Sequence, residues 1–308
     1  KLRPSGLSGN GVVNMTDSRI TSRTLSFRGT NIDADTSDYY LKALKGNGYG
    51  FVATNANSHV NFDTQHTTFS LNTDSSLVGR PEVEYICKMT NFDYDMKSRT
   101  LQMMQKGRES STLMPAEKLI RVPLDKTEKP TFFSTNNMKD TVSFASGSGT
   151  YYLEKDYMKI DNVNYVKVAD ALIQPGGGTL IISSGARISK ADSSIVAISN
   201  GSILQSASIV IEGSAFYSGS GIYDYTDEAG KIQQISFPKI EVDTMASSAK
   251  GYIPVSQNFT LSPAFTYSGD VALRSNRDNL SFTGAAGIIT KCANINSSPV
   301  KFSAVIDP

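Results

Sequence analysis

The sequence predicts an all-β protein, most simply a repetitive β-solenoid of the parallel β-helix kind with antiparallel hairpin elements. Between positions 161 and 211, short apolar clusters recur about every seven or eight residues, and Gly, Ser, Asn or Asp separate most of them. The spacing lacks the steps of three and four residues that a helix requires. Short β-branched runs bounded by turn residues are instead typical of strands. Their even placement indicates either successive rungs of a parallel solenoid or a tight antiparallel meander. The clusters centre on Ile173, Ile181, Ile188, Val196, Leu204 and Val210.

Composition divides the chain into three regions. Residues 6–105 are predicted to form a β-rich repeat region, and residues 141–308 a β-solenoid and hairpin region. Residues 106–140 between them are rich in charge and proline and poor in periodicity, which indicates a charged linker or exposed loop. A short helix near residues 116–120 is the one helix we expect there. All three regions could belong to one continuous domain, because 308 residues can bury a sizeable core.

The first region reads as a series of short strands. Residues 6–35 alternate loosely, and Gly9, Gly11 and Gly29 mark bends or close approaches of neighbouring backbones. Residues 36–45 fit a helix no better than a strand, and we interpret them as a strand. Residues 48–105 continue the alternation of apolar and polar positions that one wet and one dry face produce.

The last third of the chain contains glycine at a predicted turn and in a recurring phrase. Alternating residues flank the sequence Asp227-Glu228-Ala229-Gly230, which predicts a β-hairpin. A related phrase then recurs, as YSGSGIY at 217, YSGDVAL at 267 and FTGAAGI at 282, with GLSGNGVV near the start as a looser copy. We interpret each glycine as a place where a strand passes so close to its neighbour that no side chain fits.

Charge and composition exclude several classes of partner. The formal net charge is +1, from 30 basic and 29 acidic residues scattered along the chain, so neither nucleic acid nor an anionic membrane surface is indicated. No run of 18 apolar residues exists, so no transmembrane helix is expected. The chain has no Trp, so a carbohydrate-binding surface here would rely on Tyr. Because neither terminus resembles the polar cap of a solenoid, we expect a piece of a longer protein.

The two cysteines, Cys87 and Cys292, match no metal-binding spacing. An elongated solenoid would keep positions so distant in sequence apart. We therefore expect two buried thiols rather than a disulfide.

Histidines and paired aspartates are the first candidates for chemistry. His59 and His66 are seven residues apart and so cannot share one face of one strand, which argues against a metal-binding or acid–base pair. The aspartates of NIDAD, Asp33 and Asp35, share a face, as do Asp93 and Asp95 of NFDYD. Each pair could bind calcium or act as acid and base, although neither has the glycine-containing loop of an EF-hand. Asp224, Asp227 and Glu228 cluster at the predicted hairpin tip, where turn formation accounts for them.

Two further motifs are weaker. The run Gly176-Gly177-Gly178 precedes a strand rather than a helix, so it does not fit a phosphate-binding loop. Arg187 and Lys190 beside Asp192 are the local candidates for the calcium-assisted chemistry of a β-helix polysaccharide lyase, which is the enzymatic alternative. We assign no catalytic, cofactor-binding or metal-binding residue, and we predict no cofactor and no enzymatic activity.

Five phrases of the sequence are specific as a set. They are NIDADTSDYYLKAL (31–44), VEYICKMTNFDYDMKSRTLQM (83–103), YVKVADALIQPGGGTLIISSGARI (165–188), YSGSGIYDYTDEAGKIQQISF (217–237) and FTLSPAFTYSGDVAL (259–273). Together they resemble a segment of very large β-rich cell-envelope proteins of Bacteroidetes. The resemblance covers most of residues 6–308 and implies an exported protein of the cell envelope, in the periplasm or on the outer surface, with a structural or transport-related role. It brings no catalytic residues. A looser likeness in pattern exists to lipopolysaccharide-bridge and AsmA-type proteins, whose open β-troughs carry lipid.

These observations predict a non-catalytic structural or interaction segment of a large cell-envelope protein. Its expected partners are other segments of the same long chain or other envelope proteins. The alternative is a β-scaffold that binds polysaccharide or carries lipid. A ladder of outward-facing Tyr residues would favour polysaccharide, and a groove lined with aliphatic side chains would favour lipid.

Overall fold

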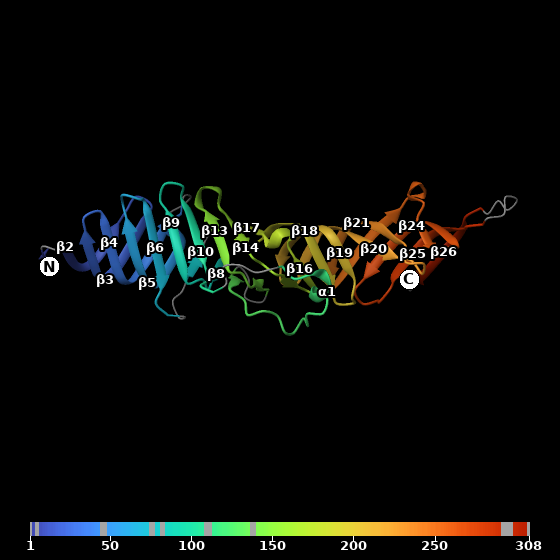
Figure 1. Cartoon of the computed structure of the whole chain (residues 1–308), viewed down its shortest axis with the longest axis horizontal. Coiled ribbons are helices and arrows are strands. Elements are labelled where there is room, and N and C mark those ends of the chain that lie inside the picture. The colour runs from blue at the N-terminus through green and yellow to red at the C-terminus, as the bar shows by residue number, and fades with distance from the viewer. Residues whose placement is uncertain are drawn as a thin grey trace. The chain divides into compact units, whose positions relative to one another are not determined.

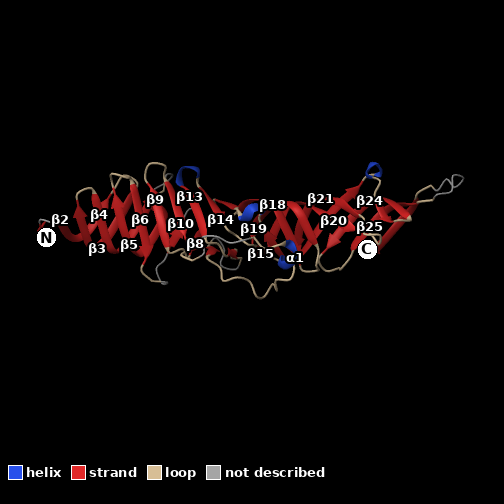
Figure 2. Ribbon diagram, viewed as in Figure 1, coloured by secondary structure: helices blue, strands red, loops and turns tan. Residues whose placement is uncertain are grey.

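The computed structural model describes residues 2–3, 6–43, 48–73, 78–80, 84–107, 113–135, 140–290 and 298–306. It is all-β, with 63% strand and 5% helix (Figure 2). The chain divides into two compact units, which we describe separately. Unit 1 contains residues 1–113, 128–166 and 177–189, and unit 2 contains residues 114–127, 167–176 and 190–308.

Unit 1 is a succession of antiparallel strands (Figure 1). Its first five strands lengthen along the chain, and shorter strands follow. They are β1 (Leu2–Arg3), β2 (Gly6–Asn14), β3 (Ser18–Arg28), β4 (Asn31–Lys42), β5 (Tyr49–Asn61), β6 (His66–Leu71), β7 (Val78–Arg80), β8 (Tyr85–Cys87), β9 (Asn91–Asp95), β10 (Thr100–Met104), β11 (Phe132–Ser134), β12 (Ser143–Phe144), β13 (Ser148–Tyr152), β14 (Tyr157–Asp161), the start of β15 (Val166–Val168), β17 (Leu180–Ser183) and the start of β18 (Ile188–Ile198).

The long strands of unit 1 bend in the middle. The pairing of β4 with β5 shifts register after Ala34, where Thr36 has a φ of 48°, and the facing strand has Asn55 at 55°. Such bulges turn a strand sharply and increase its twist. Beyond the bend, the two halves of β5 have different partners, because residues 56–61 pair with β6 and residues 52–53 pair with β7. The sheet thus folds into two leaves.

We call the two leaves of unit 1 leaf A and leaf B. Leaf A contains residues 24–28, 31–35 and 56–61 of β3, β4 and β5, followed by β6, β9, β10, β13, β14 and β17. Leaf B contains residues 18–21, 37–42 and 49–53 of the same three strands, followed by β7, β8, β11 and β12.

The core of unit 1 lies between the leaves. Tyr39 of leaf B stacks on Phe69 of leaf A with ring centroids 4.9 Å apart, and Phe51 of leaf B lies 5.5 Å from Phe92 of leaf A. All four side chains are at most 3% exposed. Burial also raises the pKa of Tyr39 to about 12. The interior of this unit is therefore packed with side chains.

Unit 2 is also built from long antiparallel strands interrupted by β-bulges. It contains helix α1 (Ala116–Leu119) and a series of antiparallel strands. Its bulges fall between Gln205 and Ser208 and between Gly219 and Gly221. Its strands are the rest of β15 and β18, β16 (Ala171–Gln174), β19 (Ile203–Gly213), β20 (Phe216–Thr226), β21 (Ile232–Asp243), β22 (Ala246–Ile253), β23 (Thr260–Ser262), β24 (Phe265–Arg274), β25 (Leu280–Ile288) and β26 (Val300–Ile306).

The prediction of an all-β chain is confirmed, but a parallel β-helix is not shown. The registers of the strands between 141 and 308 are antiparallel, as in the pairs β14–β17, β16–β18 and β24–β25. The sheet is not closed. The physical reason is that evenly spaced short strands satisfy their backbone groups equally well in either direction, and spacing alone does not select one. A simple meander, the other interpretation of the spacing in residues 161–211, does not describe that stretch either, because β14 pairs with β17 and β16 with β18. Consecutive strands do pair from β19 to β22 and from β24 to β26.

Several local predictions are confirmed. The short helix is α1, and residues 36–42 are strand. The hairpin turn lies where predicted, with Gly230 N donating to Asp227 O over 2.8 Å. A side chain at Gly219 would collide with the backbone of Ser208, and one at Gly284 with the backbone of Ser268. Gly9 differs, because nothing lies within 4 Å of the place where its side chain would be.

Candidate binding furrow

The outer face of leaf A, which faces away from the core, carries rows of short polar side chains that run across the strands. In the first row each residue is the direct cross-strand partner of the next, so the row follows from the registers alone. A second row lies beside it, two residues further along each strand. The first row is Ser26, Asp33, His59, Thr68, Asp93 and Gln102, and the second is Thr24, Asp35, Asn57, Ser70, Asn91 and Met104.

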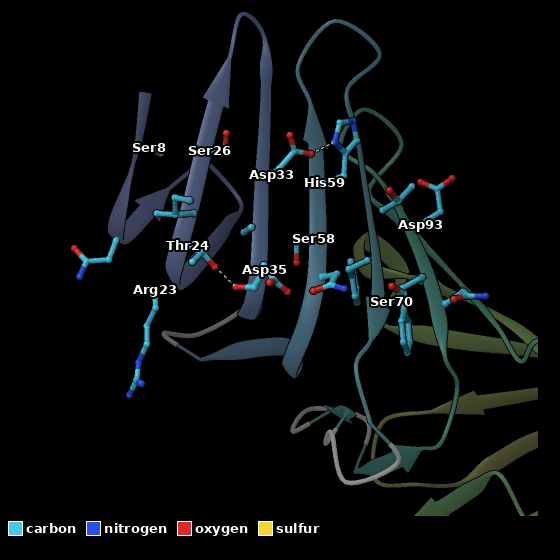
Figure 3. A pocket seen from close by; sticks show the side chains of 18 of the residues that line it. Ser8, Arg23, Thr24, Ser26, Asp33, Asp35, Ser58, His59, Ser70 and Asp93 are labelled. Carbon is cyan, nitrogen blue, oxygen red and sulfur yellow. Dashed lines mark hydrogen bonds and ion pairs between the residues drawn. The ribbon is translucent and has the colours of Figure 1, made fainter. Parts of the chain in front are cut away.

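An open hollow of about 1350 Å³ lies over these rows, and we call it the furrow (Figure 3). Its described lining contains no Lys and no Glu, and Arg23 is its one long charged side chain. Lys and Glu are long and mobile, and they usually cover the wet face of a sheet. Short Ser, Thr, Asn and Asp side chains leave the surface hollow and present hydrogen-bond donors and acceptors close to the strands.

Two histidine–aspartate pairs lie on this face. His59 Nδ1 is 2.7 Å from Asp33 Oδ1, and His66 Nδ1 is 2.8 Å from Asp93 Oδ1. In Figure 3 the side chains of Asp33 and His59 point toward each other along the first row. The hydrogen bond to Asp93 raises the pKa of His66. In both pairs the bond occupies Nδ1 and leaves Nε2 as the second hydrogen-bonding atom of the ring.

The prediction that His59 and His66 cannot share one face was wrong. Asn61 pairs with His66, and His59 pairs with Thr68, so the chain turns between the histidines and brings both onto the same face as diagonal neighbours. An odd separation places residues on opposite faces only within one continuous strand. Each imidazole is nevertheless bound to a different aspartate. The described residues contain no group of three or more His, Cys, Asp or Glu arranged to hold a metal ion.

The two aspartate pairs belong partly to one site. Asp33 and Asp35 of β4 and Asp93 of β9 line the same furrow, although sequence reasoning treated them as separate features. Asp95 has a different role, since it accepts hydrogen bonds from Lys97 N over 2.8 Å and Ser98 Oγ over 2.7 Å at the following turn. The bonds from Ser98 lower the pKa of Asp95. Turn formation therefore accounts for this fourth carboxylate.

The other candidates do not join this site. Gly176, Gly177 and Gly178 form a kinked 3₁₀ segment before strand β17, with Gly177 at a left-handed φ of 61°. Asp192 accepts a hydrogen bond from Ser208 over 2.7 Å, and the side chain of Lys190 lies outside the described part of the chain.

At the hairpin tip, Asp227 Oδ1 accepts bonds from Ala229 N over 3.0 Å and Lys231 N over 2.9 Å, as turn formation predicts. Asp224 accepts a bond from Gln205 over 3.1 Å. Cys87 is buried, and Cys292 falls outside the described residues, so their pairing stays a prediction.

Sequence reasoning missed the amide and hydroxyl residues of the second row. Asn57, Ser70 and Asn91 carry no motif, and single polar residues on alternating strands are expected wherever one face is wet. The usable signal was collective, namely the absence of Lys and Glu from residues 49–95 except at positions 82, 84 and 88.

Unit 2 has a different hollow. A pocket of about 510 Å³ lies among strands β24, β25 and β26, with Tyr225 and Glu228 of the hairpin at its side. Its lining is mainly apolar and includes Phe265, Ile288 and Val300, which are 45%, 59% and 64% exposed. Exposed aliphatic side chains around a hollow are typical of surfaces that contact apolar partners.

No protein-family model, curated protein or solved structure matches this chain. Among the described helices, none has the length and apolar character needed to cross a membrane. The class of this protein is therefore defined by its fold and its two hollows. The protein is all-β and built of antiparallel strands, with a polar furrow on unit 1 and an apolar pocket on unit 2.

Proposed function

We propose that the chain is a non-catalytic binding scaffold of a large cell-envelope protein, and that the furrow of unit 1 holds an extended glycan. The observation that carries the proposal is the continuous double row of short polar side chains across β3, β4, β5, β6 and β9. A glycan offers hydroxyl groups that both donate and accept hydrogen bonds, and the Ser, Thr, Asn, Asp and His side chains of the rows complement them.

The charges in the furrow favour a neutral polymer. The described lining has three aspartates, Asp33, Asp35 and Asp93, and one cationic side chain, Arg23, so it repels a polyanion. Hydrogen bonds to His59 and His66 already engage Asp33 and Asp93, which leaves less for a polycation to gain. A neutral chain of hydroxyl-rich residues can instead use every polar group individually.

A binding role fits this site better than catalysis. The side chains of His59 and Asp33 are 48% and 47% exposed, and the furrow is open along its length. Enzymes that use acid–base groups generally exclude water around them, which strengthens their electrostatic interactions. The rest of the expected role, contact with other segments of a longer chain or with envelope proteins, stays part of the proposal.

Binding of neutral polysaccharides to the full chain, measured by affinity electrophoresis and calorimetry, tests this function. We expect the variant with His59→Ala, Asn57→Ala and Asn91→Ala to bind at least tenfold more weakly, since several hydrogen bonds to the ligand are lost. The matched control is Lys239→Ala with Glu241→Ala, an exposed ion pair on unit 2. The polymer should keep its length during incubation. Absence of binding to every neutral polysaccharide tested, equal weakening in the control, or shortening of the polymer would each refute the proposal.

The second candidate function is lipid carriage, and the apolar pocket of unit 2 favours it. The packed interior of unit 1 offers no trough, so this role would rest on unit 2. A fluorescent fatty acid should bind, and Val300→Asp, which places a carboxylate in the lining, should abolish binding. Val305→Asp is the matched control, because Val305 is 54% exposed on the same strand and does not line the pocket. Equal binding by both variants would eliminate lipid carriage.

A further inference from the structure

A pair of stacked tyrosines lies on the same outer face as the furrow. Their row is set by the registers, in which His66 pairs with Asp95, Asp95 with Thr100, Thr100 with Tyr152, and Tyr152 with Tyr157. Direct partners in an antiparallel sheet share a face. Tyr152 and Tyr157 therefore lie on the outer face of leaf A in a third row, two residues beyond the first row, which itself continues through Thr150 and Lys159.

The two rings are held in a defined arrangement. Their centroids are 4.8 Å apart with an interplanar angle of 25°, and Lys155 Nζ lies 6.0 Å from the Tyr152 ring. Both tyrosines are only partly buried. The next residues in the row, Thr100 and Ser183, are small, so the rings stand above their neighbours.

Cross-strand stacking alone would give the sheet about 0.2–1 kcal/mol of stability, and it explains why two aromatic residues face each other. It does not account for the partial exposure of both rings on the outer face that also carries the furrow. A tyrosine combines an apolar ring with a polar hydroxyl, which suits the apolar ring face and hydroxyl rim of a sugar.

We propose that Tyr152 and Tyr157 form an aromatic sugar-stacking subsite on the outer face of leaf A, beyond the β10 edge of the furrow. This inference rests on the proposed glycan-binding function and deepens it by setting the length of the ligand. Five strand spacings separate β5 from β14 (β5, β6, β9, β10, β13, β14), which corresponds to roughly 24 Å at about 4.8 Å per spacing. A linear glycan that contacts both His59 and Tyr157 must therefore span several sugar residues, and a disaccharide reaches only one of the two places.

The test uses a chain-length series of the polysaccharide that the full chain binds. Replacing Tyr152 and Tyr157 together by Ala should weaken the binding of long oligomers about tenfold and leave that of disaccharides in the furrow unchanged. Tyr157→Phe should bind as the original chain does, because it retains the ring. The matched control is Tyr40→Ala with Tyr49→Ala, an aromatic pair of leaf B with ring centroids 4.9 Å apart.

The outcomes separate this inference from the proposed function. If the Tyr152 and Tyr157 variant binds long oligomers normally, or if the control pair weakens binding equally, the subsite does not exist, although the furrow can still bind glycan. If the furrow variant and the tyrosine variant both bind every oligomer normally, the function and the subsite fail together. Unfolding measured by circular dichroism checks that both double variants remain folded.

Discussion

Units 1 and 2 are both built from antiparallel strands that bend at β-bulges, but they expose different side chains. In both, long antiparallel strands bend at bulges and enclose an aromatic core, with Phe69 and Phe92 stacked in unit 1 and Tyr225, Phe259 and Phe282 in contact in unit 2. The outer face of unit 1 carries short polar side chains around a hollow. Unit 2 instead exposes an apolar pocket and long charged residues such as Lys239 and Glu241. The same bent sheet thus carries two different surfaces, and the outward-facing side chains, rather than the backbone, set the chemistry of each.

The strongest test of this shared architecture is removal of a core aromatic in each unit. Phe92→Ala in unit 1 and Phe282→Ala in unit 2 should each lower the free energy of unfolding by about 3–5 kcal/mol, because both side chains are almost fully buried. Denaturant titration measures the loss. Ser70→Ala, on the outer face, is the control and should change it little. A loss below about 1 kcal/mol in either unit would show that its core is not packed as described.

The units also differ in the hydrogen-bond partners of their buried serines. Removal of these serines should give the second largest change in the free energy of unfolding. In unit 2, Ser247 donates from Oγ to Asp170 and from N to the same carboxylate, and its Oγ lies 2.6 Å from Tyr217 Oη. Ser247→Ala should cost roughly 1.5–3 kcal/mol, since a bond to a charged group is lost. Ser37→Ala in unit 1 should cost less, about 1 kcal/mol, because Ser37 bonds to the neutral Ala56 carbonyl and Ser58 hydroxyl. The reverse order in thermal or chemical unfolding would contradict this assignment.

Close approaches at glycine offer a finer comparison. A side chain at Gly284 of unit 2 would meet the rigid backbone of Ser268 and, at 2.7 Å, the Cα of Gly269. At Gly149 of unit 1 the nearest atom is the mobile Cδ1 of Ile160, at 2.8 Å. Gly284→Ala should therefore cost about 1–3 kcal/mol and more than Gly149→Ala. Gly9→Ala, with open space around it, should be tolerated. Equal stability of all three variants would remove the close-approach explanation of the repeated glycine phrase.

The smallest expected effect concerns the ion pair of His66 with Asp93 in unit 1. Unit 2 contains no histidine. The pKa of His66 is raised by Asp93, so its contribution to stability is fully present below pH 6.5 and is lost as the pH rises through the folded-state pKa. The His66 and Asp93 side chains are 42% and 33% exposed, so solvent screening limits the contribution to at most about 1 kcal/mol. His66→Gln should remove this part of the pH dependence between pH 5 and 8, as measured by unfolding at each pH. If the free energy of unfolding of the variant depended more strongly on pH, the His66–Asp93 pair would not stabilise the folded state at low pH as described.

The local features of the fold followed from the sequence where short-range physics decides them. Asp227 and Gly230 indicated their turn because side-chain acceptors and a left-handed glycine act within a few residues. The alternation around Val60 and Phe69 indicated strands for the same reason. The grouping of Asp33, His59 and Asp93 could not be predicted, because it depends on registers between strands that are up to 60 residues apart in sequence.

The sequence by itself determined an all-β chain, its turns, its crowded glycines and its lack of strong net charge. These depend on neighbouring residues and on composition. The tertiary structure alone decided the antiparallel direction of the strands, the bend of β3, β4 and β5 between the two leaves of unit 1, and the face on which His59 and His66 meet. Hydrogen bonds between strands set all three, and a single strand carries no record of which partner it will have or in which register.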